Sequence, residues 1–496
     1  MSSTIQRQSI LSTIVIFAGF GFGALNLIIL QKWLLTTEEW GLTRVVTEAA
    51  ILMANFATFG TTTVTAKFLP FYRRYLPSAE NDLPFVTLSI FAIGLAITLS
   101  LLLLLRTQIV HIFGKNNPLF EPYYFTLLLF VCFQGVFLFM EIHAWFAGKT
   151  ILANVLKELL FRLLTTVCLL MIAVKLVAFN GFMWLFACTY LPGAVILAYA
   201  VRRKGAFLIH TKISSLTFRL RGKMASLASF VFLTTLSNIA FVVCDTLFLA
   251  SMYNFSQAGI YAVAQYFSQV VEVPMRSMQT SSVPLVSEYW RAKNMIGLGS
   301  IYKKSCINLL LAGMGIGGLI IVNINNIGAH FGESYHIMLL PLLVLVISRW
   351  INLGTGLNST IIQFSSYWRF DFFSTLIYSV IGIPLNFLLI RSYGMLGAAL
   401  ANVMAMLIYN TVRFIFIYKK FGLQPFDRNN LFLLLSGSVL IAGVYFIPSY
   451  SNPYLDGIGR SILFGLLFLV LVLKANFSDE LTQLWKKWSG KLFRQG

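Results

Sequence analysis

Long apolar runs separated by short polar segments dominate this chain from residue 8 to residue 475. A helix that crosses a bilayer needs about 20 mostly apolar residues. Fourteen runs meet this requirement, although Gly, Pro or a lone charge interrupts several of them: 8–30, 44–69, 83–105, 122–142, 156–176, 182–201, 226–249, 258–286, 305–323, 337–358, 371–390, 395–417, 430–448 and 460–475. The pattern predicts an all-α polytopic membrane protein with about fourteen transmembrane helices.

Composition supports this prediction and narrows the class of protein. The chain has 496 residues, of which 58% are hydrophobic and 11% charged, whereas soluble domains average about 45–50% and about 25%. Seventeen carboxylates cannot cover a water-soluble surface of this size, which excludes a cytosolic enzyme and a nucleic-acid-binding domain. The five cysteines lie singly in apolar runs and have no CxxC spacing, so we expect them to be buried rather than redox-active or metal-bound.

The distribution of Lys and Arg predicts the orientation in the membrane. The N-terminal residues run into the first apolar stretch without an A-x-A-like cleavage site, so we expect a first span and not a signal peptide. With the N-terminus inside, the cytoplasmic segments hold 26 basic residues, the outer segments seven and the spans four. Cytoplasmic loops are enriched in Lys and Arg. The net charge of +20 is therefore mainly a topology signal, and it predicts that both termini are cytoplasmic.

The two halves of the chain resemble each other. Gly41 and Gly259 each precede a long apolar helix, Glu121 and Glu333 each precede a Tyr by two residues, and Gly181 pairs with Gly394 at a similar offset. Because six spans is an even number, the copies form a parallel repeat about an axis along the membrane normal. The predicted domains are a first lobe (1–200), a basic cytoplasmic linker (201–225), a second lobe (226–420), two further transmembrane helices (421–475) and a basic tail (476–496).

Four short stretches carry a family resemblance. They are EEWGL at 38–42, CDTLFLASMYNFSQAGIYAVA at 244–264, HFGESY at 330–335 and YGMLGAALANV at 393–403. They resemble signatures of polysaccharide-biosynthesis flippases of the multidrug/oligosaccharidyl-lipid/polysaccharide (MOP) exporter superfamily, over about residues 8–420. Thr36 and Thr37 depart from the Gly-Pro that often precedes the first of these motifs.

The resemblance implies a function that composition does not show. Family members move polyprenyl-diphosphate oligosaccharides from the cytoplasmic to the outer leaflet by alternating access between two six-helix lobes. It implies a bacterial inner-membrane protein that serves cell-surface polysaccharide assembly, is not an enzyme and has no cofactor. The implied partners are a lipid-linked oligosaccharide, membrane lipids, a proton or sodium ion as the coupling ion, and other polysaccharide-assembly proteins, but no nucleic acid.

Charges inside the predicted spans are the candidate functional residues, because a charge at mid-membrane is costly and needs a partner or a role. The spacing of Glu158 and Arg162 and of Glu272 and Arg276 fits i,i+4 ion pairs, whereas Arg349 has no carboxylate at helical spacing. Arginine offers planar, bidentate donors to a diphosphate. One interpretation places these cations in a substrate-binding cavity, namely Arg276, Arg349, Arg162 and Lys67. The alternative is that they only pair with carboxylates.

Carboxylates in the spans are candidates for ion coupling or gating, since a desolvated carboxylate can take up a proton or bind a cation. They are Asp245, Glu272, Glu48 and Glu158, for which helix capping or pairing is an equally good interpretation. GMGIGG at 313–318 lies inside a predicted span, so helix packing explains it better than a nucleotide site. No metal site is expected.

Two other functions stay open at this point. A cation-coupled multidrug antiporter of the same superfamily would favour a smaller pocket that is richer in carboxylates. A membrane-embedded polysaccharide polymerase or ligase would need catalytic groups outside the membrane, but the predicted outer segments are all about fifteen residues or shorter.

Overall fold

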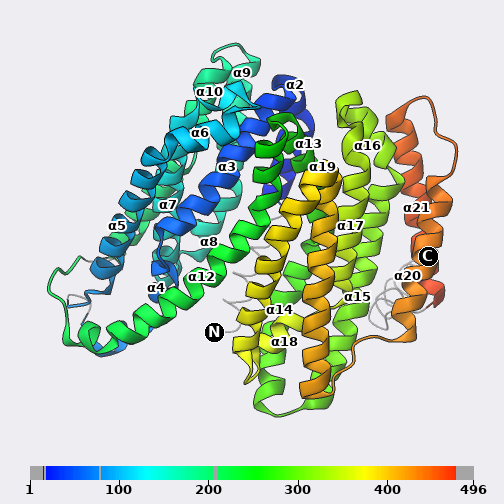
Figure 1. The fold of residues 1–496 in the computed structure, drawn as a ribbon. Coiled ribbons are helices and arrows are strands. Elements are labelled where there is room, and N and C mark those ends of the chain that lie inside the picture. The colour runs from blue at the N-terminus through cyan, green and yellow to red at the C-terminus, as the bar shows by residue number, and fades with distance from the viewer. Residues whose placement is uncertain are drawn as a thin grey trace, which may run out of the picture. The chain divides into compact units, whose positions relative to one another are not determined.

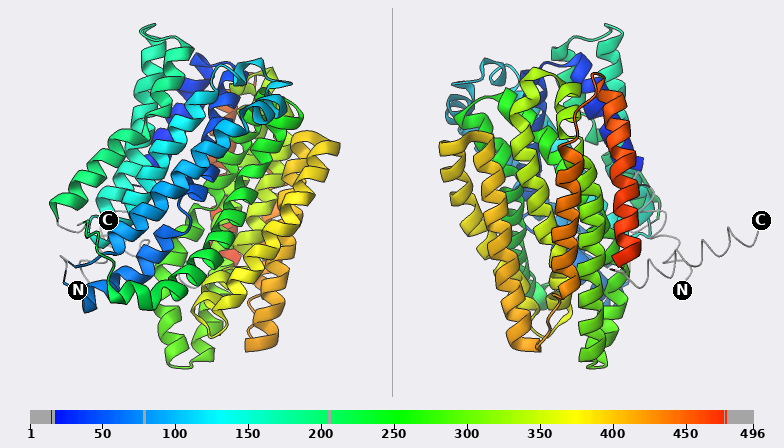
Figure 2. Two further views of the ribbon diagram at one scale, coloured as in Figure 1. Left: turned by 60° about the vertical axis from the view of Figure 1, so that its left-hand side comes forward. Right: turned by 90° about the vertical axis from the view of Figure 1, so that its right-hand side faces the viewer.

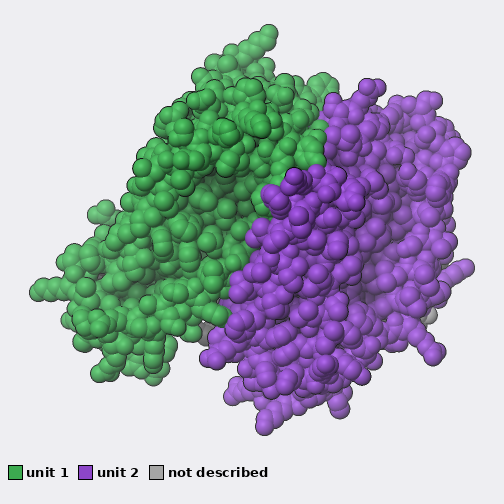
Figure 3. All heavy atoms as spheres, in the orientation of Figure 1, with its two compact units in different colours: residues 1–262 green, residues 263–496 purple. Residues whose placement is uncertain are grey.

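The structure is a computed structural model that describes residues 15, 18–77, 80–204, 207, 209–475 and 477. Most of the predicted tail at 476–496 and the start of the first predicted span lie outside the described residues. The chain forms two compact units, residues 1–262 and 263–496 (Figure 3). The division between them falls inside one helix, α13 (Phe255–Val271).

The regular elements among the described residues of unit 1 are all helices (Figure 1). Its elements are η1 (Asn26–Gln31), α2 (Lys32–Leu34), α3 (Thr37–Ala57), α4 (Thr61–Tyr75), α5 (Leu83–Leu104), α6 (Arg106–Gly114), η2 (Pro118–Phe120), α7 (Tyr124–Phe146), α8 (Thr150–Asn154), η3 (Val155–Leu160), α9 (Phe161–Ala173), α10 (Phe179–Ala187), α11 (Tyr190–Arg203), α12 (Ser215–Met252) and the first half of α13. Two of these, η1 and η3, are single π-helical turns within longer helices. The helix α12 begins inside the segment that was predicted to be a linker.

Unit 2 holds the remaining helices (Figure 2). They are α14 (Val273–Arg291), α15 (Met295–Val322), α16 (Ile324–Phe331), η4 (Glu333–Met338), α17 (Leu339–Gly354), α18 (Asn358–Phe364), α19 (Trp368–Phe421), α20 (Arg428–Tyr445) and α21 (Pro453–Ala475). α17 packs against α19 and α15, and α15 also packs against α20 and α21.

Eight described helices are long and apolar enough to cross a membrane, and α3 with α4 adds a ninth as a pair bent by 44°. The prediction of an all-α, multi-pass membrane protein is therefore confirmed, while the number fourteen and the side of each terminus stay predictions. Two physical features lower the count. Charges interrupt the helix formed by α8, η3 and α9, and the predicted span 258–286 is divided between α13 and α14.

One of the eight helices contains two of the predicted spans. Gly394 in the YGMLG stretch has φ 56° and ψ −132°, so α19 is two helical arms joined by a sharp turn. Glycine adopts this positive φ without the steric cost that a Cβ would add. The arms face each other, because Phe370 stacks on Phe416 with ring centroids 3.8 Å apart. The turn between the predicted spans 371–390 and 395–417 is therefore set by Gly394.

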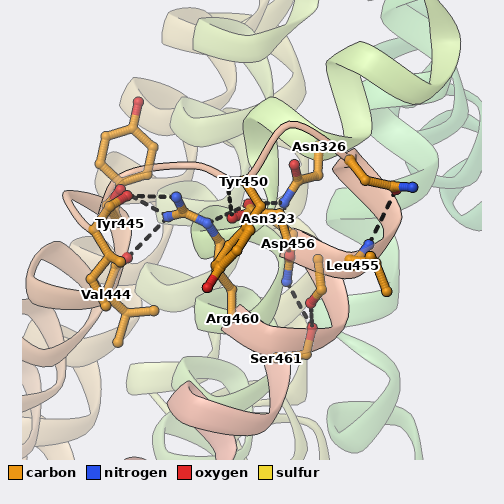
Figure 4. A network of polar contacts seen from close by, with 12 residues as sticks. Asn323, Asn326, Val444, Tyr445, Tyr450, Leu455, Asp456, Arg460 and Ser461 are labelled. Atoms are coloured by element: carbon orange, nitrogen blue, oxygen red, sulfur yellow. Dashed lines mark hydrogen bonds and ion pairs between the residues drawn. The ribbon is translucent and has the colours of Figure 1, made fainter.

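A buried polar network joins α20 to α21 (Figure 4). The Arg460 guanidinium donates hydrogen bonds to the carbonyl oxygens of Val444 (3.0 Å), Tyr445 (3.0 Å) and Ile447 (2.6 Å), at the end of α20. Its Nε also donates to Asp456 Oδ2 at 2.6 Å. The last carbonyls of a helix have no partner within the helix, so Arg460 satisfies them and fixes the α20–α21 turn.

We expect Arg460→Gln to destabilise unit 2 by about 3–5 kcal/mol, since breaking a buried ion pair leaves an uncompensated charge on Asp456. Thermal unfolding of the purified protein in detergent measures the effect. Lys474→Gln, an exposed charge on the same helix, is the matched control and should change stability by less than about 0.5 kcal/mol. Equal melting curves for the two variants would contradict the assigned role of Arg460.

Candidate functional site

A break between two helices of unit 2 positions an ion pair that includes the predicted binding residue Arg349. α13 ends at Val271 and α14 begins at Val273, with Pro274 in its first turn. Proline lacks a backbone N–H, which has no partner in the first turn of a helix, so proline is well tolerated at such a start. The break places Glu272 where it meets α17: Arg349 Nη1 lies 3.2 Å from Glu272 Oε2, and Asn352 Nδ2 donates to Glu272 Oε1 at 2.8 Å.

This geometry corrects the sequence interpretation of Arg349. The sequence offered Arg349 no carboxylate at helical spacing, yet the structure pairs it with Glu272 from another helix. Their side chains keep 14% and 20% of their accessible surface, so the pair is largely but not fully removed from solvent. Arg276, which follows Glu272 by four residues, is exposed on α14.

The predicted pair in unit 1 is confirmed. Arg162 Nη1 lies 3.4 Å from Glu158 Oε2, and the guanidinium lies over the Phe20 ring at 5.1 Å. Glu158 is part of the π turn η3, and the neighbouring helix carries the π turn η1. Asn26 of η1 donates to the Arg162 carbonyl at 3.0 Å. π turns expose backbone groups that an α-helix would satisfy, and they are frequent at functional sites.

A second ion pair lies next to it in sequence. Lys157 Nζ is 3.1 Å from Glu141 Oε1, and the Glu141 side chain is 7% exposed. Lys157 belongs to η3 and neutralises a buried carboxylate of α7. Its position inside the apolar run 156–176 is the signal that could have identified it.

The most deeply buried cation was also missed. Arg413 is fully buried and donates from Nε to Ser374 Oγ at 3.0 Å and from Nη2 to Asp371 Oδ1 at 2.5 Å. Its guanidinium lies 4.0 Å from the Tyr409 ring centroid. Arg413 lies inside the predicted span 395–417. It joins the two arms of α19 at the end opposite to Gly394.

The remaining predicted residues lie in unit 1 and are mostly paired. Asp245 is 1% exposed and accepts a hydrogen bond from Tyr261 Oη at 2.9 Å. Glu48 forms an ion pair with Arg44, one helical turn before it. Lys67 is exposed on α4. The structure therefore divides the predicted set, with Arg276, Arg349 and Glu272 in unit 2 and the other five in unit 1.

An apolar slot runs between α17 and α20 within unit 2. It consists of two cavities of about 520 Å³ and about 340 Å³, and both are lined by Ile347 and Trp350 of α17. On α20 the lining residues recur about every four positions, so they form one stripe along the helix: Asn430, Leu434, Ser438, Ala442 and Tyr445. Cavities of this volume are typical of ligand sites.

The smaller cavity contains an unused hydrogen-bond donor. Asn430 is 6% exposed, and its Nδ2 has no hydrogen-bond partner among the described residues. A buried polar group without a partner is costly. The slot therefore has mainly apolar walls, and the amide of Asn430 lies beside it at the start of α20.

The repeat-related glycines Gly41 and Gly259 contact each other inside unit 1. A Cβ on Gly259 would lie 2.9 Å from the Thr37 carbonyl oxygen and 2.9 Å from the Gly41 nitrogen. Trp40 Nε1 donates to the Gly259 carbonyl at 3.1 Å, and Ser256 Oγ donates to Thr37 Oγ1 at 2.8 Å. The starts of α3 and α13 thus form a tight seam on the side that the charge distribution predicts to be outer.

The glycine-rich stretch at 313–318 packs against other helices. Trp350 Nε1 donates to the Gly313 carbonyl at 2.8 Å, and a Cβ on Gly317 would lie 2.5 Å from that nitrogen. A Cβ on Gly318 would collide with the Phe464 ring. Among the described residues, no group of three or more His, Cys, Asp or Glu side chains could hold a metal ion.

Comparisons place this architecture among known membrane proteins. No family model and no curated protein matches the chain. A solved structure of the lipid II flippase MurJ, in an inward closed conformation, matches 95% of this chain and 100% of its own with a TM-score of 0.71 at 15% identity. The chain has the fold of the MOP transporter superfamily.

Multidrug transporters share the MOP fold over less of this chain. An inward-facing MATE transporter covers 83% of this chain and 98% of its own, with a TM-score of 0.63 at 14% identity. The MATE transporter VcmN of Vibrio cholerae covers 90% and 99%, with a TM-score of 0.54 at 14% identity. The three named proteins are a lipid II flippase and two MATE transporters.

The seam between α3 and α13 gives a direct test. In a variant without native cysteines, Thr37→Cys and Ser256→Cys should form a disulfide under mild oxidation, because the two hydroxyl oxygens are 2.8 Å apart. Adding Gly259→Leu should lower the yield several-fold, since the side chain has no room against α3. Gly222→Leu, at a helical glycine of α12 with nothing within 4 Å, is the control and should leave the yield unchanged.

Proposed function

We propose that this protein flips a lipid-linked oligosaccharide, carried on a polyprenyl diphosphate, from the cytoplasmic to the outer leaflet by alternating access, and so serves cell-surface polysaccharide assembly in a bacterial inner membrane. A proton or a sodium ion is the proposed coupling ion. Support comes first from the fold, because the MurJ match extends over nearly the whole chain. The MATE matches leave 10 to 17% of it uncovered.

One observation carries the proposal: α17 presents a cation on one side and an apolar slot on another. Arg349 and Asn352 meet Glu272, while Ile347, Trp350 and Ile351 line the slot. A lipid-linked sugar combines a hydrocarbon chain with an anionic diphosphate. Because apolar walls can accommodate a hydrocarbon chain by van der Waals packing and guanidinium groups bind phosphate bidentately, a single helix can hold both parts of such a molecule.

The proposed roles follow from exposure and pairing. Arg349 and the exposed Arg276 bind the diphosphate, and Asn430 donates to an oxygen atom of the lipid. Glu272 competes with the diphosphate for Arg349, so substrate binding frees the carboxylate to take up the coupling ion. In unit 1, Arg162 and Lys67 supply further positive charge, while Asp245, Glu48 and Glu158 act in coupling or gating. The seam of Gly41 and Gly259 closes the outer side.

A double substitution distinguishes substrate binding from simple pairing. Arg349→Gln should lower flipping of a fluorescent polyprenyl-diphosphate disaccharide in proteoliposomes by about 10- to 100-fold, the loss of one charge-assisted contact. The double variant Glu272→Gln/Arg349→Gln removes both charges and so leaves no uncompensated ion. It should therefore be present at normal protein levels but should still not flip the substrate. If the double variant flips at the wild-type rate, Arg349 is only a structural partner. Drug efflux by the wild type without flipping would instead favour a multidrug antiporter.

The slot has its own test. Ser438→Trp fills the larger cavity and should lower flipping at least several-fold, because the hydrocarbon chain loses its place beside α17. Val439→Trp adds the same side chain at the next position of α20, where Val439 is 72% exposed, and serves as the control. Equal flipping rates for the two variants in the proteoliposome assay would show that the slot does not hold the chain.

A further inference from the structure

The helix α12 is longer than a membrane span. It has 38 residues, which corresponds to about 57 Å at 1.5 Å per residue. Even at a tilt of about 40°, the upper end of the observed range, it would rise about 44 Å, whereas the hydrocarbon core is about 30 Å thick. Its apolar stretch is at residues 226–249, so the first turns, from Ser215, project beyond the hydrocarbon.

One side of these first turns is fixed to the rest of unit 1. Asp82, which is fully buried, accepts hydrogen bonds from the Ser214 backbone nitrogen (2.8 Å), Ser214 Oγ (2.8 Å) and Thr217 Oγ1 (2.7 Å). Tyr72 of α4 shares a 2.7 Å hydrogen bond with Thr217, and Met224 is buried against the same helix. The start of α12 is therefore held in place on α4 and α5.

The exposed part of the helix surface carries four residues that we call the basic face of α12: Phe218, Arg219, Arg221 and Lys223. All four residues are exposed, Phe218 by 63%. At 100° per residue, Arg219 and Lys223 lie across the helix from Thr217 and Met224, while Phe218 and Arg221 lie on the flank between. Arg221 lies 4.4 Å from the Phe218 ring centroid. None of the three cations forms an ion pair with a carboxylate in the part of the chain that the structure describes.

We propose that the basic face of α12 is a binding site for anionic phospholipid headgroups, separate from the flipping site. The three cations match the headgroup phosphates, and Phe218 provides an apolar side chain that can enter the boundary between headgroups and acyl chains, as aromatic residues do at membrane interfaces. Because α12 continues directly into an apolar span, this face lies at headgroup depth. The fixed helix also loses little conformational freedom on binding.

A lipid fits these features better than an acidic protein does. The exposed Phe218 and the exposed Ile213 just before the helix would stay in water against a purely polar partner. The surface lies on the side that the charge distribution predicts to be cytoplasmic, where membranes carry most of their anionic lipid. Binding there would hold the start of α12, and with it α4 and α5, against the leaflet.

The test is a lipid titration of the full-length protein in detergent, followed by native mass spectrometry. Phosphatidylglycerol should bind at least about tenfold more tightly than phosphatidylcholine with the same acyl chains. Arg219→Gln/Arg221→Gln/Lys223→Gln should weaken phosphatidylglycerol binding by about fivefold per charge, or roughly 100-fold, and leave phosphatidylcholine unchanged. High salt should have a similar effect.

A matched triple variant separates a specific site from general charge. Lys293→Gln/Lys303→Gln/Lys419→Gln removes three exposed cations of unit 2 that are predicted to lie on the same side of the membrane, and it should weaken binding only slightly. Equal losses in both triple variants, or no preference for phosphatidylglycerol in the wild type, would overturn the proposal, and the second result would favour an acidic protein partner. Both measurements are independent of flipping, so they test this proposal separately from the proposed function.

Discussion

Pairing of charges inside apolar helices is the constraint on which this structure depends. A lone ion in hydrocarbon costs several kcal/mol, so each buried cation must lie against an anion or a polar group. Arg349 meets Glu272, Lys157 meets Glu141, and Arg413 meets Asp371. In each case the partner comes from a different helix or from the other arm of α19. The charges therefore determine which helices lie together, a role that apolar contacts alone cannot fill in lipid.

This constraint also explains how a transport site can exist in such a protein. Both Arg349 and Glu272 keep part of their surface accessible, whereas in the pair of Arg413 and Asp371 only the carboxylate does. A cation that keeps part of its surface accessible can exchange its partner for an anionic ligand at modest cost, whereas a fully buried cation cannot. The break before Pro274 and the π turns at η1 and η3 interrupt regular helices close to charged residues. These are the places where a helix can change shape with the smallest loss of hydrogen bonds.

Local spacing in the sequence predicted one ion pair within a helix. Glu158 and Arg162 were predicted as a pair from their spacing, and the structure pairs them. Long-range pairs could not be predicted in this way: Glu272 with Arg349 and Lys157 with Glu141 each join different helices, and hydropathy gives no information about which helix a side chain faces. The repeat comparison aligned Gly41 with Gly259, but the sequence did not show that the two glycines pack against each other.

The sequence by itself determined that this is an all-helical membrane protein, because the length and frequency of apolar runs leave no other way to satisfy the backbone. It also separated the predicted spans 371–390 and 395–417, while the structure showed that Gly394 makes the turn between them. Only the tertiary structure decided which charges pair, where the slot between α17 and α20 opens and which side of α12 stays exposed. Those features depend on contacts between segments far apart in the chain, and many arrangements of the same helices are compatible with one hydrophobic pattern.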